Sequence, residues 1–182
     1  MRSQDAGAEA PPLYRATVPV LVAVLDRVEA TLGHARSQLG PEGIAAALEQ
    51  RPAPKMLPAG RQLATTAQLT LRIAWPLAGR RPPELRGGFD ADGLAERLVA
   101  ARERLAELAP DEFLGAETRP VRFQAGFADL ELPGLAFLHG FGLPNLYFHQ
   151  AMLHVALKQA GVRLGKADFD GVHEYPEGYS FG

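Results

Sequence analysis

The chain of 182 residues contains no cysteine, which excludes disulfide bonds, thiolate catalysis and cysteine-ligated metal sites. Serine is also scarce, because Ser3, Ser37 and Ser180 are the only three in the sequence. Two of these serines lie near the ends of the chain, and none follows a strand in the way a nucleophilic serine requires. A serine triad is therefore not expected. The missing cysteine is compatible with a reducing compartment, and we expect a cytoplasmic location.

The chain also lacks an excess of either charge and a long apolar run. Its net charge of −2 provides no general attraction for nucleic acid or for anionic membranes. The apolar segment 18–25 is much shorter than the roughly 20 residues that a membrane-spanning helix needs. This segment is interrupted by Pro19, follows Asp5 and Glu9, and has no small-residue cleavage site after it. We therefore expect no nucleic-acid partner, no membrane span and no secretion.

Apolar residues repeat every three or four positions in four long segments, which is typical of helices with one buried face. The segments cover about residues 14–35, 57–78, 90–108 and 144–160. The first three carry the stripes Leu21, Leu25, Val28 and Leu32; Leu63, Ala67, Thr70, Ala74 and Leu77; and Leu94, Leu98, Ala101, Leu105 and Leu108. Because four stripes can cover one another around one core, the pattern predicts a mainly α-helical four-helix bundle.

Shorter elements complete the prediction. Residues 41–50 suggest a short helix, and residues 119–124 and 127–132 alternate as in a small β-hairpin before the last helix. Gly140, Gly142 and Pro144 are expected to break the helical region that opens at Pro133, and Gly161 should end the last helix. We expect a flexible tail over residues 1–12, a single domain over 13–171 and a second tail over 172–182.

The histidines of the last helix raise the question of a metal site. His149 and His154 are five residues apart, so a regular helix points them about 140° away from each other. Two such side chains do not reach one ion, and the helices over 57–78 and 90–108 contain no histidine. We therefore predict neither a metal nor another cofactor. His154 falls on a stripe with Leu143, Tyr147, Gln150 and Leu157, and should point inward.

Two pairs of polar residues are candidates for a binding site. Asn145 lies one helical turn before His149, and could fix the tautomer of His149 for proton transfer. It could equally form a buried hydrogen bond that stabilises the bend at Pro144. Arg61 and Gln62, early in the second long helix, form the other pair. Arg61 is either a surface residue or a buried cation, which would need a carboxylate such as Asp129, Glu131 or Asp168.

Four motifs resemble an uncharacterised domain-of-unknown-function family within the DinB/YfiT-like superfamily of four-helix bundles. The motifs are YRATVPV at 14–20, MLP at 56–58 with Arg61 and Gln62, LPNLYFH at 143–149, and GVRLGKADF at 161–169. The resemblance implies an antiparallel, up-down bundle with a long crossover, often a homodimer. Many superfamily members bind a metal through one histidine of the second helix and two of the last, a pattern that this sequence lacks. The family instead points to Asn145, His149, Arg61 and Gln62.

Three functions remain open at the level of the sequence. The first is a DinB-like protein that binds a small molecule or serves an accessory role, with a site that includes Arg61, Gln62, Asn145, Tyr147, His149 and His154. The second is an enzyme, a hydrolase or a thiol-dependent transferase, with His149 as the candidate catalytic base. The third is a structural or protein-interaction module, which an exposed apolar stripe on one helix would favour.

Overall fold

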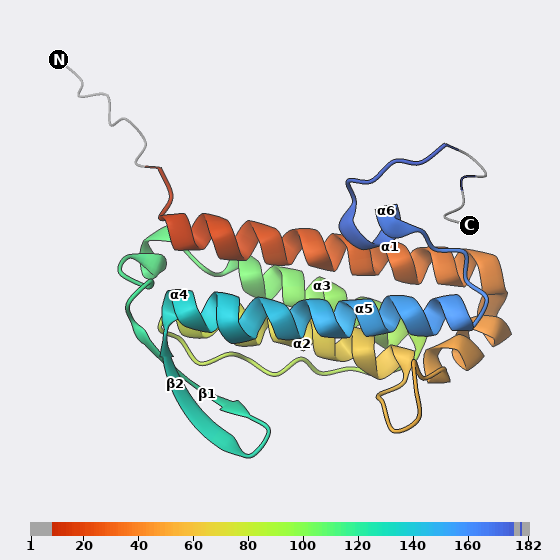
Figure 1. Cartoon of the computed structure of the whole chain (residues 1–182), viewed down its shortest axis with the longest axis horizontal. Helices are drawn as coiled ribbons and strands as arrows, with labels where there is room; N and C mark the ends of the chain where they lie inside the picture. The colour runs from red at the N-terminus through yellow and green to blue at the C-terminus, as the bar shows by residue number, and fades with distance from the viewer. Residues whose placement is uncertain (1–8, 177–178, 180–182) are drawn as a thin grey trace.

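Four long helices pack side by side in the computed structural model, which describes residues 9–176 and 179 (Figure 1). They are α1 (Pro12–Glu49), α2 (Ala59–Leu77), α3 (Ala91–Ala106) and α5 (Leu143–Gln159). The shorter elements are the 3₁₀-helix η1 (Pro110–Phe113), β1 (Pro120–Ala125), β2 (Ala128–Pro133), α4 (Gly134–Phe137), the π-helical turn η2 (Leu138–Gly142) and α6 (Lys166–Asp170). Most of the predicted tail 1–12 and part of the predicted tail 172–182 lie outside the described residues.

The core consists of the apolar stripes that the sequence predicts. Every residue of the three stripes on α1, α2 and α3 is buried, including Thr70 and Leu108. Asp90 caps α3, because its carboxylate accepts a hydrogen bond from the Gly93 N–H at 2.8 Å. None of the described helices combines the length and the apolar character that are needed to cross a bilayer.

The long crossover implied by the resemblance lies between α2 and α3. The carboxylates of Asp92 and Asp26 pair with Arg36 and Arg102, so α3 runs antiparallel to α1. The Ala59 N–H donates to the Gln50 carbonyl at 2.8 Å, so the chain reverses between α1 and α2 as well. Helices α2 and α3 therefore run in the same direction, and residues 78–90 return along the bundle to connect them (Figure 1).

This crossover segment is fixed by one buried arginine. Arg97 on α3 donates to the carbonyls of Leu85, Gly87 and Gly88 at 3.0, 2.5 and 3.0 Å. Gln68 on α2 holds the same segment through two further hydrogen bonds to backbone groups. The Arg97 side chain is only 9% exposed, and backbone carbonyls satisfy its donors in place of a carboxylate. The segment is therefore attached to both helices that it connects.

The first helix extends further than the sequence pattern predicts. The segments 14–35 and 41–50 were expected as two helices, and α1 does consist of two helical arms, which meet at a kink where Gly40 has non-helical dihedral angles. No helix-breaking residue occurs between positions 36 and 39, so the helix continues past the end of its apolar stripe. Gly40 then adopts φ 66°, a left-handed conformation that glycine reaches without strain, and Pro41 starts a second arm that ends at Glu49.

The predicted break before the last helix is also wrong. The chain stays helical from Gly134 to Gln159, and the π-helical turn η2 replaces the break. The Leu143 N–H donates to the Leu138 carbonyl, five residues earlier, which widens the turn just before Pro144, a residue without an N–H. Gly142 also allows close packing, because a Cβ at this position would lie 3.1 Å from the Ile73 side chain on α2.

The β-hairpin and the end of α5 agree with the prediction. Strands β1 and β2 pair antiparallel from Pro120 opposite Pro133 to Ala125 opposite Ala128. At the end of α5, Gly161 has φ 91° and the Val162 N–H donates to the Leu157 carbonyl. The chain then turns back through α6, which packs on α1 and α5 (Figure 1).

Candidate functional site

The two histidines of α5 face different neighbours. His149 lies on the side of α5 that contacts α2, and its Nδ1 is 2.6 Å from Oε1 of Gln62. His154 lies on the side that contacts α6, with its ring centroid 6.0 Å from that of Phe169 in an edge-on arrangement. The two rings therefore face different helices and do not converge, as the five-residue spacing predicts.

The predicted inward stripe of α5 is correct for Gln150 and Leu157, which are buried, and wrong for Tyr147, which is exposed. The buried face consists of Leu146, Gln150, Leu153, Ala156 and Leu157. Tyr147 is 37% exposed, and His154 lies half-buried at the edge of this face. Apolar side chains occur on almost every side of α5, so the sequence defines its buried face weakly.

The hydrogen bond between Gln62 and His149 determines which ring nitrogen of the histidine carries a proton. Gln62 is only 1% exposed, and its Nε2 donates to the Leu57 carbonyl at 3.2 Å. This bond orients the amide so that Oε1, which can only accept, faces the imidazole. Nδ1 of His149 must then be the donor, and Nε2 of the neutral ring keeps a free lone pair.

Burial keeps this imidazole in its neutral form. It lowers the pKa of His149 below the ordinary value of 6.5, because the half-buried ring loses hydration that the charged form needs. Nε2 makes no hydrogen bond to any residue in the described part of the chain. The arrangement is a half-buried, neutral acceptor in a fixed orientation, which can accept a hydrogen bond or a proton from a molecule placed beside it.

The Asn145 side chain forms no hydrogen bond with His149. Its Nδ2 donates to the Phe141 carbonyl at 2.7 Å, inside the π-helical turn. Of the two roles left open by the sequence, this geometry corresponds to the hydrogen bond that stabilises the bend before α5. The tautomer of His149 is instead fixed from α2, by Gln62.

Arg61 contacts an aromatic ring. Its guanidinium lies 3.4 Å from the centroid of Phe89, at the end of the crossover segment, and is exposed. It forms no ion pair with any residue between 9 and 176. The carboxylates considered as its partners bind elsewhere: Glu131 to Arg122, Asp168 to His34, and Asp129 to Gln124. Arg61 lines a cavity of about 300 Å³ whose walls include neither Asn145 nor His149.

His154 belongs to a separate environment near α6. Burial lowers its pKa, the charge of Lys158 lowers it further, and Asp168 acts in the opposite direction. Its neighbour Gln150 is buried, with Nε2 donating to the Phe169 carbonyl at 2.9 Å and Oε1 unpartnered. These contacts attach α6 to the bundle. The structure therefore brings Gln62 and His149 together and leaves Arg61, Asn145, Tyr147 and His154 at other places.

Comparison with known proteins agrees with the resemblance in the sequence. A family model described as "Domain of unknown function (DUF1993)" matches residues 13–170. The chain belongs to this family. It is also similar to the crystal structure of a DinB family member from Shewanella denitrificans, with a TM-score of 0.79 and 23% identity over 90% of this chain and 94% of that chain. At this identity the likeness shows the fold alone. No curated protein matches the sequence.

In this DUF1993 chain, the residue of the second long helix that meets His149 is Gln62, whose amide oxygen is already used by the imidazole. Within residues 9–176 and 179, no three His, Asp or Glu side chains are grouped as metal ligands.

Two residues in the surroundings of Arg61, Phe89 and Arg97, were not singled out in the sequence of this DUF1993 chain. The ring of Phe89 belongs to the crossover segment, and its centroid lies 3.4 Å from the guanidinium carbon of Arg61 and 4.6 Å from that of Arg97. Nothing in the local pattern marks Phe89. Arg97 did carry a signal, because it lies three residues after Leu94 and four before Ala101, on the apolar stripe of α3. A charged residue on a buried stripe requires partners.

Proposed function

We propose that this protein binds a small molecule at the Gln62–His149 pair, as a DinB-like bundle without the three-histidine metal site. The observation that supports the proposal is the hydrogen bond that places a proton on Nδ1 and leaves Nε2 as an acceptor. The ligand should therefore present an N–H or O–H group to Nε2. The lack of cysteine supports a cytoplasmic location for this activity.

The proposal can be tested with a pair of probes that differ in one donor. Phenol has an O–H that can reach Nε2, and anisole is a similar molecule without it. In ¹⁵N-detected NMR we expect phenol to shift the Nε2 resonance of His149, and anisole to leave it unchanged. The His149→Gln variant removes the signal, whereas the matched variant His154→Gln should retain the full response. Equal shifts with both probes, or a protonated Nε2 in the free protein, would contradict the proposal.

An enzyme that uses His149 as a base is a second candidate, because the same free lone pair could take a proton. The lowered pKa makes this nitrogen a weaker base than a free histidine. If a reaction is found, its rate should fall as the pH drops below the pKa of His149 measured by NMR. Gln62→Glu places a negative charge beside the ring, so it should raise both this pKa and the pH at which the rate falls.

The outer face of α5 favours self-association, and we propose a homodimer there. Pro144, Phe148, Ala151 and Val155 follow one another at helical spacing on this face, and Phe148 and Val155 are 50% and 38% exposed. Apart from its two histidines, α5 contains one residue that is charged near neutral pH, Lys158. Two copies can therefore bring the same apolar stripe together around a two-fold axis without repulsion.

Sedimentation analysis tests this dimer directly. We expect the wild type to sediment as a dimer and the double variant Phe148→Glu/Val155→Glu as a folded monomer. Val99→Glu is the matched control, because Val99 is 46% exposed on the separate helix α3. A wild type that stays monomeric at high concentration, or a dimer that also dissociates with Val99→Glu, would exclude the α5 interface.

A further inference from the structure

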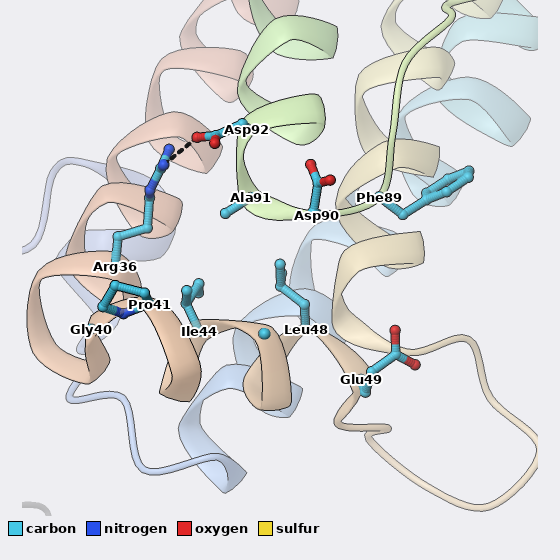
Figure 2. A pocket seen from close by; sticks show the side chains of 11 residues that line it. Arg36, Gly40, Pro41, Ile44, Leu48, Glu49, Phe89, Asp90, Ala91 and Asp92 are labelled. Carbon is cyan, nitrogen blue, oxygen red and sulfur yellow. Dashed lines mark hydrogen bonds and ion pairs between the residues drawn. The ribbon is translucent and has the colours of Figure 1, made fainter.

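The kink in α1 produces a second cavity, distinct from the Gln62–His149 pair. At Gly40 the helix turns, and the arm from Pro41 to Glu49 crosses below the start of α3 (Figures 1 and 2). The space between the arm and α3 has a volume of about 700 Å³. This is within the range of about 300–1,000 Å³ that is usual for small-molecule sites. None of its lining residues belongs to the pair.

The floor of this cavity is apolar. Ile44 and Leu48 point from the arm toward Ala91 and Asp90 at the start of α3 (Figure 2). Pro41, Ala45 and Phe89 extend the apolar lining. Ile44 and Leu48 are 6% and 4% exposed, so they belong to the packed core and form a wall of fixed shape. A ligand would bury an apolar body against this wall.

The charges around the cavity are unequal. Three carboxylates, those of Glu49, Asp90 and Asp92, and one guanidinium, that of Arg36, give the lining a formal charge of −2. Arg36 is paired with Asp92, as the dashed line in Figure 2 marks. One carboxylate oxygen of Asp90 accepts a hydrogen bond from the Gly93 N–H. Glu49 has neither an ion pair nor a hydrogen bond to any described residue, so within residues 9–176 and 179 neither Glu49 nor Asp90 is paired with a cation.

The geometry points to a binding site for an organic cation, with an apolar or aromatic body on the Ile44–Leu48 floor and one ammonium group between Glu49 and Asp90. The floor supplies burial, which does not depend on ligand charge. The two carboxylates select a cation over an anion of the same shape, because an anion would face uncompensated negative charge. The inference does not rest on the proposed role of His149.

Three probes of equal size separate these contributions. They are 2-phenylethylamine, the neutral 2-phenylethanol and the anionic phenylacetate, titrated into the full chain while ¹⁵N and methyl NMR signals of the arm and of α3 are followed. We expect the amine to shift the signals of Ile44, Leu48 and Ala91 at the lowest concentration, the alcohol at a higher one, and phenylacetate at none. Added salt should weaken the binding of the amine and leave the binding of the alcohol unchanged.

Substitutions on the two charged residues test the selection of a cation. Glu49→Gln combined with Asp90→Asn should weaken the amine by about fivefold to tenfold and leave the alcohol unchanged, since each exposed charge pair contributes a few-fold in affinity. Asparagine at position 90 can still cap α3. The sole variant Asp92→Asn should release Arg36 and weaken the amine as well, by placing an unpaired cation at the rim.

A pair of neighbouring substitutions tests whether the ligand occupies this cavity. Ala45 and Ala46 are both exposed on the arm, but only Ala45 lines the cavity. Ala45→Trp should fill the space and abolish the response to amine and alcohol, whereas Ala46→Trp should leave both unchanged. Absence of binding by the amine, binding of phenylacetate as strong as that of the amine, or equal effects of the two tryptophans would overturn the inference. Loss of amine binding leaves the phenol test at His149 unaffected, so the two proposals fail separately.

Discussion

Two polar side chains on either side of α2, Arg97 and His149, are satisfied to different degrees. Arg97 reaches from α3 to the crossover segment, and each of its three donor nitrogens has a backbone carbonyl partner. His149 reaches from α5 to Gln62, but it uses only one of its two ring nitrogens. A buried polar group with all its partners holds the fold together. A polar side chain that forms a hydrogen bond through only one of its polar atoms is held in place by the protein, and its other polar atom can contact a ligand.

The largest effect should come from removing Arg97, because it has more hydrogen-bond partners than His149. Arg97→Met keeps an apolar stem of similar length but leaves three carbonyls of the crossover segment without their donor. We expect the free energy of unfolding to fall by about 2–4 kcal/mol, since hydrogen bonds to charged groups contribute more than neutral ones. Urea denaturation followed by the fluorescence of Trp75, the single tryptophan, measures the change.

A second arginine on α3 provides the matched control. Arg104 is exposed and pairs with Glu107, the residue that follows α3, so Arg104→Met should lower the free energy of unfolding by less than about 1 kcal/mol. If the two variants were equally stable, Arg97 would not hold the crossover segment and the contrast with His149 would disappear.

An intermediate effect is expected from Gln62→Ala. It leaves the Leu57 carbonyl and Nδ1 of His149 without their partner, so the free energy of unfolding should fall by about 1–3 kcal/mol. The free imidazole should also become a mixture of its two neutral tautomers, which ¹⁵N chemical shifts resolve. A ring that keeps its proton on Nδ1 in this variant would show that Gln62 does not fix the tautomer.

Asn145→Ala should have a smaller effect, restricted to the fold. The Phe141 carbonyl loses one donor, and we expect a decrease of about 1 kcal/mol in the free energy of unfolding. The tautomer and the pKa of His149 should remain those of the wild type, because the Asn145 side chain forms no hydrogen bond with the ring. A changed tautomer would return Asn145 to the role of partner that the sequence left open.

The smallest effect should appear in the dependence of stability on pH. Burial lowers the pKa of His149 and of His154 in the folded state, while the unfolded chain titrates near 6.5. Below this value the unfolded state binds more protons, so stability should decrease as the pH falls through 6.5 and level off below the folded pKa values. His149→Gln should make this decrease shallower in urea denaturation between pH 7.5 and 5. An unchanged slope would show that the ring titrates normally.

The sequence predicted those parts of the fold that depend on regular periodicity. The stripes that begin with Leu21, Leu63 and Leu94 repeat over several turns, so the helices and their buried faces follow directly. The phase of α5 could not be obtained in this way, because Tyr147, Phe148 and Val155 make its outer face as apolar as its inner one. The kink at Gly40 and the π-helical turn depend on backbone geometry that the pattern of side chains does not encode.

Gln62 and His149 were both among the candidate residues named from the sequence, but their contact was not predicted. They are 87 residues apart, and the periodicity within each helix does not show which residues of two helices meet. Contact with His149 was one of the two roles left open for Asn145, since four residues separate the two. In the structure the Asn145 amide instead donates to the carbonyl of Phe141 in the π-helical turn, which is the other role.

The π-helical turn has a further consequence for reading relatives of this chain. A hydrogen bond to the fifth preceding residue encloses one residue more than a bond to the fourth, so Leu138–Gly142 acts as an insertion of a single position. Phe137 before the turn and Leu146 after it are both buried, although a regular helix would not give them this relation. A homologue whose last helix is uninterrupted should therefore align with this chain only when a one-residue gap is opened between positions 138 and 142.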